Sequence, residues 1–353
     1  MKRLSMALGL AAALLVADSR RPAQAFVFVP GVTVDAARGL AFVMEPANGI
    51  AAIDLDSGAA IAATTRAVKP LIVADGLLLA EAEPRERHHV LPLVGLSARD
   101  LTVRWTAALP LPDDLVAAVD QRSGASFNVV ARHDADGLLV EWRALRWRVS
   151  AIPTQEAAHL SEGFARIDPS KGRILASGRG KTPGQGVATV PADIQALVDR
   201  QSLVSRLCRT GGLFAALARD PRGIVLLCWR AADGRPLAKQ QLFLRHLTFR
   251  DFSADCRDLL ASHAEQGWIW SIFATATGKR VARLRLPLPG APFFVRGERL
   301  YYAATATARQ TAGRIRIETP PRVVAVDLVD GRELWAQPIR ETAYLGPYPR
   351  AAP

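Results

Sequence analysis

The hydrophobic positions of this chain form short runs in which β-branched and aromatic residues alternate with polar ones. Gly, Asp and Pro separate the runs, and these residues favour tight turns. Alternation with a period of two residues is typical of strands that bury one face. The pattern therefore predicts an all-β chain in which consecutive strands are joined by short turns.

One strand–turn–strand unit recurs: an apolar strand, an Asp near its end, a Gly four residues later, and a second strand. Its fullest copy spans residues 323–337 (VVAVDLVDGRELWAQ) and adds a Trp four residues after the Gly. A variant copy at residues 95–105 turns without Gly and regains the Trp. The residues that form the repeated turns are Asp54, Gly58, Asp168, Gly172, Gly234, Gly278, Asp327, Gly331 and Trp335.

Turn chemistry accounts for this spacing without a catalytic role. Glycine adopts the positive φ that other residues resist. An Asp side chain can accept hydrogen bonds from backbone N–H groups of its own turn, and a Trp can bury a large apolar area on a neighbouring sheet. Four copies carry alanine where the Trp would stand: Ala62, Ala176, Ala238 and Ala282. We therefore expect altered packing between consecutive sheets.

The repeated turns follow one another at intervals near the 40–50 residues of a four-stranded β-propeller blade. We expect a single propeller of antiparallel blades, about seven in number within a range of six to eight. A long hairpin at residues 127–150 is either a seventh blade or part of the third. Residues 191–206 begin with Pro and carry apolar residues near one face, which predicts a short helical insertion.

The repeated unit resembles the repeat of pyrroloquinoline-quinone (PQQ) binding-like β-propellers, also called quinoprotein-dehydrogenase-like propellers. The match is full from Ala325 to Trp335 and partial in the other copies. The resemblance implies the fold but leaves the activity open, because the superfamily contains quinone-dependent dehydrogenases as well as cofactor-free binding scaffolds. The adjacent Cys-Cys pair of the large alcohol dehydrogenases and the C-x-x-C-H haem motif are both missing from this sequence.

Residues 1–25 have the three parts of an export signal. Lys2 and Arg3 are followed by an apolar run at residues 8–17, and Ala23-Gln24-Ala25 is a small-x-small cleavage site. The apolar run is shorter than the roughly 20 residues needed to span a bilayer. We therefore expect a signal peptide at 1–25, a mature propeller at 26–353, and a periplasmic or secreted location without a transmembrane segment.

The sequence has three cysteines, so at most one disulfide can form within the chain. An exported compartment permits such a bond. Cys228 lies in the apolar run IVLLCW and is expected in the core, whereas Cys208 and Cys256 lie outside such runs. We therefore predict a disulfide between Cys208 and Cys256.

Lysine and arginine outnumber aspartate and glutamate by 45 to 33, a formal net charge of +12. A basic surface attracts anionic membranes, polysaccharides or nucleic acid, and export makes nucleic acid the least suitable of the three. One segment combines arginine with aromatic residues: Trp142, Arg143, Arg146, Trp147 and Arg148. It could bind an anionic or sugar ligand by cation–π and stacking contacts, although a strand whose Trp side chains pack in the sheet is the favoured interpretation.

The first hypothesis for function is a non-catalytic binding or scaffolding propeller that acts through loops on one face. It expects no cofactor, no metal site, no nucleic acid, a monomeric chain, and a protein or another cell-envelope component as partner. The alternative, implied by the resemblance alone, is a diverged quinoprotein oxidoreductase that depends on PQQ and Ca²⁺. A weaker alternative is binding of polysaccharide or an anionic surface. The sequence identifies no catalytic and no cofactor-binding residue.

Overall fold

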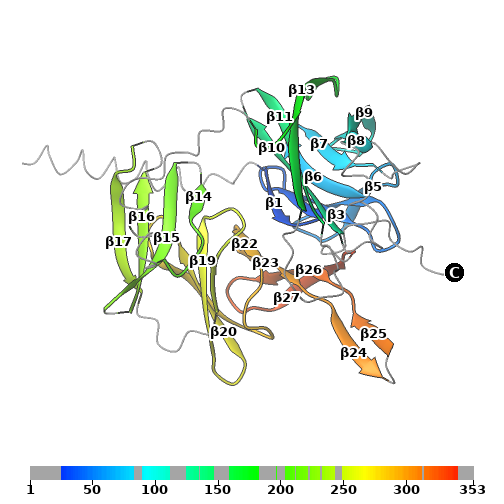
Figure 1. Ribbon diagram of the computed structural model, residues 1–353. Coiled ribbons are helices and arrows are strands. Elements are labelled where there is room, and N and C mark those ends of the chain that lie inside the picture. Colours follow the sequence, from blue (N-terminus) through cyan, green and yellow to red (C-terminus); the bar gives the residue numbers. More distant parts are fainter. Residues whose placement is uncertain are drawn as a thin grey trace, which may run out of the picture. The chain divides into compact units, whose positions relative to one another are not determined.

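A computed structural model gives the structure of the chain (Figure 1). The described residues are 25–82, 90–111, 125–134, 136–146, 159–182, 196, 203–210, 212–221, 223–230, 233–242, 249–311 and 314–340. Every named element in these ranges is a β-strand. The prediction of an all-β chain is therefore confirmed for this part of the sequence.

Three antiparallel sheets form from the N-terminal half of the chain. The first contains β1 (Ala25–Val29), β2 (Val32–Asp35), β3 (Leu40–Met44), β4 (Ile50–Asp54) and β5 (Ala60–Thr64). The second contains β6 (Lys69–Ala74), β7 (Leu77–Glu81), β8 (Val90–Ser97) and β9 (Val103–Pro110). The third contains β10 (Ala125–Asp134), β11 (Gly137–Arg146), β12 (His159–Ile167) and β13 (Ile174–Arg179).

Three further four-stranded sheets follow. The fourth contains β14 (Cys208–Thr210), β15 (Leu213–Asp220), β16 (Gly223–Arg230) and β17 (Pro236–Leu242). The fifth contains β18 (Phe249–Phe252), β19 (Asp258–Ala264), β20 (Trp268–Ala274) and β21 (Arg280–Leu286). The sixth contains β22 (Phe293–Arg296), β23 (Arg299–Ala304), β26 (Arg322–Asp327) and β27 (Glu333–Pro338). Between β23 and β26, β24 (Thr307–Thr311) and β25 (Arg314–Thr319) form a hairpin of their own, drawn in orange in Figure 1.

The described residues thus form six sheets of four or five strands. This number is one fewer than the seven blades expected from the sequence and lies within the predicted range of six to eight. The long hairpin predicted at 127–150 is β10 and β11 of the third sheet, so it is not a separate blade. In the predicted helical insertion at 191–206, only residues 196 and 203–206 are described. Ala196 is helical, as predicted. The end of the segment is not helical, because Leu203 forms a β-bridge with Ala218. This backbone pairs with the part of β15 that the short strand β14 leaves unpaired.

The chain divides into two compact units, each with its own packing. The first unit comprises Ala25–Gly186, Ala304–Val323 and Ala336–Pro353, and the second comprises Val187–Ala303 and Val324–Trp335. In the first unit, one apolar cluster lies between the first and second sheets and another between the second and third. In the second unit, a cluster joins the fourth and fifth sheets, and Trp270 of β20 packs on Phe293 and Tyr302 of the sixth. Consecutive sheets within each unit therefore pack face to face.

Candidate functional site

The repeated turns all connect the last two strands of a sheet and share one backbone geometry. In the first copy the Gly58 N–H donates to the Asp54 carbonyl at 2.8 Å, and the Asp54 N–H donates to the Ala59 carbonyl at 2.9 Å. The same two bonds recur at the turns that begin at residues 168, 230, 274 and 327. In each the glycine has a positive φ, between 64° and 76°. The repeat predicted from the sequence is therefore a hairpin motif present in every sheet but the second in this glycine form.

The aspartates of these turns bind their own backbone. The Asp54 carboxylate accepts from the Ser57 N–H at 2.7 Å, Asp168 from the Ser170 N–H at 2.8 Å, and Asp327 from the Val329 N–H at 2.8 Å. Hydrogen bonds from the Ser170 hydroxyl and N–H lower the pKa of the Asp168 carboxyl. All three carboxylates cap their own turns, which is the role that the spacing predicted.

The second sheet makes the same turn with leucine. The Leu101 N–H donates to the Ser97 carbonyl at 2.9 Å, and Leu101 has a φ of 57°. A leucine in this region costs about 1–2 kcal/mol. Its side chain is only 3% exposed and lies in the cluster between the first and second sheets, and burying a leucine contributes about 1.5–3 kcal/mol. Burial therefore offsets the strain.

Leu101→Gly is accordingly expected to destabilise the protein by about 1 kcal/mol, although it removes an unfavourable φ. Urea unfolding measures the difference. Leu101→Met keeps the buried volume and is the matched control, with a smaller expected loss. A glycine variant more stable than the wild type would show that backbone strain dominates at this turn.

Side chains from the last strand of one sheet cover the turn of the next. Trp105 of β9 donates its Nε1–H to the Pro169 carbonyl at 2.8 Å, and a Cβ built on Gly172 would clash with its ring. At two of the four alanine positions, Ala238 and Ala282, the residue two further on covers the next turn. Gln240 covers Gly278, and Leu284 covers Gly331. This substitution is the altered packing that the alanine positions predicted.

The alternation of side chains along β11 places Trp142 and Arg143 of the predicted Arg–Trp segment on opposite faces of the strand. Trp142 on β11 is 4% exposed and belongs to the core between the second and third sheets. Arg143 points to the opposite face, where it is exposed and lies 3.4 Å from Glu162. Arg146 ends β11, while Trp147 and Arg148 lie outside the described residues. The described members therefore do not form one ligand-binding cluster.

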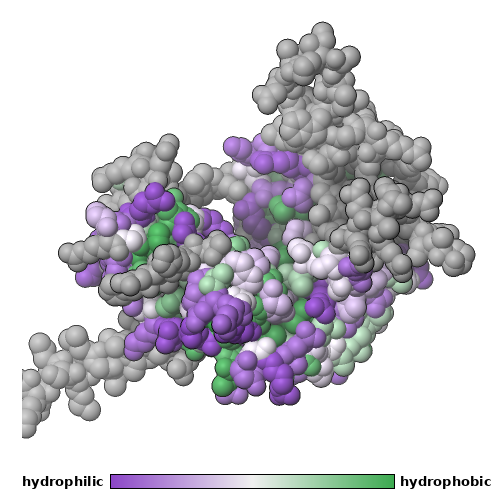
Figure 2. All heavy atoms as spheres, turned by 90° about the horizontal axis from the view of Figure 1, so that it is seen from below, coloured by the Kyte–Doolittle hydropathy of each residue, from purple (hydrophilic) through white to green (hydrophobic). Residues whose placement is uncertain are grey.

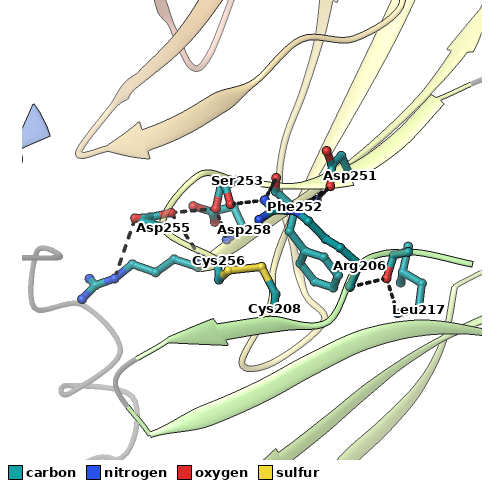
Figure 3. The surroundings of a disulfide bond; sticks show 11 residues. Arg206, Cys208, Leu217, Asp251, Phe252, Ser253, Asp255, Cys256 and Asp258 are labelled. Atoms are coloured by element: carbon teal, nitrogen blue, oxygen red, sulfur yellow. Dashed lines mark hydrogen bonds and ion pairs between the residues drawn. A yellow bond between two sulfur atoms is a disulfide. The ribbon is translucent and has the colours of Figure 1, made fainter. Parts of the chain in front are cut away.

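The structure brings two of the cysteines together (Figure 3). Cys208 on β14 and Cys256, in the turn between β18 and β19, form a disulfide with a Cα–Cα distance of 5.6 Å. It joins the fourth sheet to the fifth. Cys228 is a buried free thiol whose Sγ lies 3.1 Å from the Thr275 carbonyl. Burial raises the pKa of this thiol to about 12, so it is protonated and unreactive at neutral pH.

Alkylation followed by intact-mass measurement tests this arrangement. We expect no label on the native protein, one label after unfolding without reductant, and three after unfolding with reductant. Cys228→Ser provides the control, because it removes only the label that appears without reductant. Three labels on the unfolded, unreduced chain would rule out the disulfide.

Beside the disulfide lies a cluster of polar groups that the sequence did not reveal (Figure 3). The Ser253 hydroxyl donates to Asp255 at 2.7 Å and accepts from the Asp258 N–H at 2.9 Å. Arg257 lies 3.8 Å from Asp255. Burial raises the pKa of the Asp255 carboxyl, and burial together with the charge of Asp255 raises the pKa of Asp258 to about 8. Asp258 is therefore a neutral acid near pH 7.

The same turn ties several segments of the second unit together. Arg206 donates to the Phe252 and Ser253 carbonyls at 2.9 and 3.0 Å. The Ala254 N–H donates to the Phe293 carbonyl on β22 at 2.8 Å. The closely spaced SADCRD residues at 253–258 were the available sequence signal, but only the tertiary fold shows that they are buried. This turn is a structural junction, and burial raises the pKa of both of its carboxyls.

In the first unit an apolar strand covers the side on which the first strands of the sheets meet. β6 lies against β2 and β10, and β1 (AFVFV) pairs with β2 and also contacts β6. Phe28 of β1 is 5% exposed. Nearby, Lys69 of β6 is buried and pairs with Glu81 of β7 at 3.1 Å. An apolar strand and a paired charge therefore occupy this side.

Among the described residues no three His, Cys, Asp or Glu side chains gather closely enough to hold a metal ion. No helix among them has the length and apolar character needed to cross a membrane.

Comparisons with known proteins complete this description. No family model and no curated protein matches the chain. Among solved structures it is similar to BamB from Moraxella catarrhalis, with 14% identity, a TM-score of 0.29, and coverage of 75% of this chain and 79% of that one. It is similar to Hsv2 from Kluyveromyces lactis, with 9% identity, a TM-score of 0.35, and coverage of 85% and 90%. It is also similar to a quinohemoprotein alcohol dehydrogenase from Comamonas testosteroni, with 9% identity, a TM-score of 0.26, and coverage of 90% and 69%. Because these TM-scores lie below 0.5, no functional conclusion rests on them.

Proposed function

We propose that this chain is an exported β-propeller that binds a protein or another cell-envelope component and does not catalyse a reaction. The apolar strand β1 carries the proposal, because it pairs with β2 and packs on β6 at the side of the first unit where β6 contacts β2 and β10. A quinone enzyme would need carboxylates and space for a flat ligand where its blades converge. In this proposal the function belongs to the outer surface and its loops.

The repeat residues support the same proposal. The aspartates and glycines of the motif are engaged in the hairpin turns, where Asp54, Asp168 and Asp327 cap backbone N–H groups. The motif therefore builds a scaffold of similar sheets, and scaffolds of this kind present variable loops and strand edges to partners. The export signal at 1–25 assigns the protein to the periplasm or the exterior in this proposal.

Photo-crosslinking in the exported compartment tests the proposal. A photoreactive amino acid at exposed positions on the last strands of the sheets, such as Ile61, Leu175, Leu237 and Val281, samples the outer surface. We expect a discrete crosslinked partner at some positions and none from a buried control position such as Leu79. If none of the exposed positions gave a crosslinked partner, the proposal would be contradicted.

A titration with PQQ and Ca²⁺, followed by tryptophan fluorescence, tests the enzyme alternative. The chain has seven tryptophans, and a quinone bound near any of them quenches its emission. We expect no saturable quenching. Saturable quenching that disappears with a chelator would replace the proposed function with a cofactor-dependent one.

A further inference from the structure

The last strands of the six sheets are edge strands, and they differ sharply in charge. The sequence of β5 contains no charged residue, β9 contains Arg104, β13 contains Arg179, β17 contains Lys239, and β27 contains Glu333. By contrast, β21 reads RVARLRL and carries Arg280, Arg283 and Arg285 with no acidic residue. One edge of the second unit is therefore distinctly basic.

The backbone of β21 pairs on one side only. It runs antiparallel to β20, and no other described strand is hydrogen-bonded to it. Its side chains alternate: Ala282, Leu284 and Leu286 are buried, while Val281, Arg283 and Arg285 are exposed. Val281 is the extra residue of a bulge, so regular pairing runs from Ala282 to the end of the strand. Edge strands of this kind offer unpaired N–H and C=O groups to an added strand.

Arg283 of β21 forms an ion pair with one carboxylate, whereas Arg285 bonds only backbone carbonyls. Glu265 in the turn between β19 and β20 lies 3.2 Å from Arg283 and 3.2 Å from His263. Arg285 donates to the backbone carbonyls of Glu265 and Gln266. Lys279 and Arg280, at the other end of β21, are also exposed. Figure 2 shows that hydrophilic residues cover much of the described surface on the face drawn there.

We propose that the outer edge of β21 is a docking strand for an acidic, extended segment of a partner protein. The segment would add a fifth strand to the fifth sheet, with main-chain hydrogen bonds for affinity and carboxylates facing Arg283 and Arg285. Edges with like charges repel one another, so two copies of this chain do not pair here. The inference rests on the proposed function, since it names the surface and the chemistry of the partner.

A labelled heptapeptide with alternating glutamate and valine or threonine (EVETEVE) is the probe, and fluorescence anisotropy measures its binding. We expect saturable binding that weakens as salt is added. The double variant Arg283→Glu/Arg285→Glu should weaken binding by about tenfold or more. The double variant Arg179→Glu/Lys239→Glu makes the same charge change on β13 and β17 and should bind as the wild type does.

Charge reversal beside Glu265 risks local unfolding, so Arg283→Gln/Arg285→Gln provides a second variant with the same expected direction. Thermal unfolding of each variant verifies that the fifth sheet is intact. Equal binding by wild type and both β21 variants would overturn the proposal.

A backbone-methylated peptide separates strand addition from simple charge attraction. N-methylation of alternate residues removes half of the donors without changing charge, and we expect binding at least about tenfold weaker. Equal affinity would show that the strip attracts anions in general, as a polysaccharide or an anionic membrane would be attracted, and would overturn the docking strand.

The crosslinking and peptide-binding experiments together show whether the docking strand or the binding function itself is wrong. If Arg283→Glu/Arg285→Glu still forms the crosslinked partner and no peptide binds β21, the docking strand is wrong and the binding function stands. If no exposed position crosslinks to a partner, the binding function itself fails.

Discussion

Replacing Asp258 with asparagine is expected to stabilise the protein at about pH 9 and to leave its stability near pH 4 almost unchanged. The carboxyl lies in the buried turn that begins β19, beside the carboxyl of Asp255. Burial, together with the charge of Asp255, raises the pKa of Asp258 from 3.8 to about 8. Asparagine has a similar shape and never ionises, so it removes the unfavourable charge.

The sign of the effect follows from proton binding. Between the unfolded and folded pKa values of Asp258, the folded protein holds a proton that the unfolded chain has released. Stability from this group is therefore complete below the unfolded pKa and is lost as the pH rises through the folded pKa of about 8. We therefore expect the wild type to lose stability progressively across this pH range, whereas Asp258→Asn lacks this loss.

Urea unfolding of both proteins at half-unit pH steps measures the difference. Asp251→Asn is the matched control, because Asp251 lies one turn away, is 44% exposed and pairs with Arg206. An exposed pair of this kind contributes at most about 1 kcal/mol. The idea is wrong if Asp258→Asn and the wild type lose stability in parallel between pH 4 and pH 9.

The turn residues were predictable because local chemistry determines them. A glycine four residues after an aspartate needs only the φ preference of glycine and the reach of the carboxylate, and both operate within one hairpin. The conformation of Leu101 could not be predicted in this way. Its positive φ is unfavourable for leucine, and burial of its side chain between two sheets offsets that cost. A compensation of this kind depends on contacts that are distant in sequence.

The alternation of residues along a strand could already have excluded a joint ligand site in the Arg–Trp segment. Trp142 and Arg143 are adjacent on β11, and adjacent residues of a strand point to opposite faces. Strand periodicity alone therefore argues against a joint site, and the structure places the two side chains in that way. The buried pair Asp255 and Asp258 is the opposite case, because only the packing of their turn against neighbouring segments gives them raised pKa values.

Truncating Trp105 to alanine is expected to cost about 3–5 kcal/mol of stability, as large-to-small changes at buried aromatic positions do. The ring is 8% exposed and belongs to the cluster that joins the second and third sheets. It also satisfies the Pro169 carbonyl. Trp105→Phe keeps most of the apolar contact and loses the hydrogen bond, so its expected cost is smaller, with about 1 kcal/mol from that bond.

A double-mutant cycle with Gly172 shows whether Trp105 acts through the next turn. In the wild type, Gly172→Ala introduces a Cβ that overlaps the Trp105 ring at a φ of 68°, so it should destabilise through both the clash and the backbone. In the Trp105→Ala background the clash is gone, and only about 1–2 kcal/mol of backbone strain remains. The two losses should therefore sum to more than the loss of the double variant, by about 1 kcal/mol or more. Strictly additive losses would mean that the tryptophan stabilises its own sheet and does not hold consecutive sheets together.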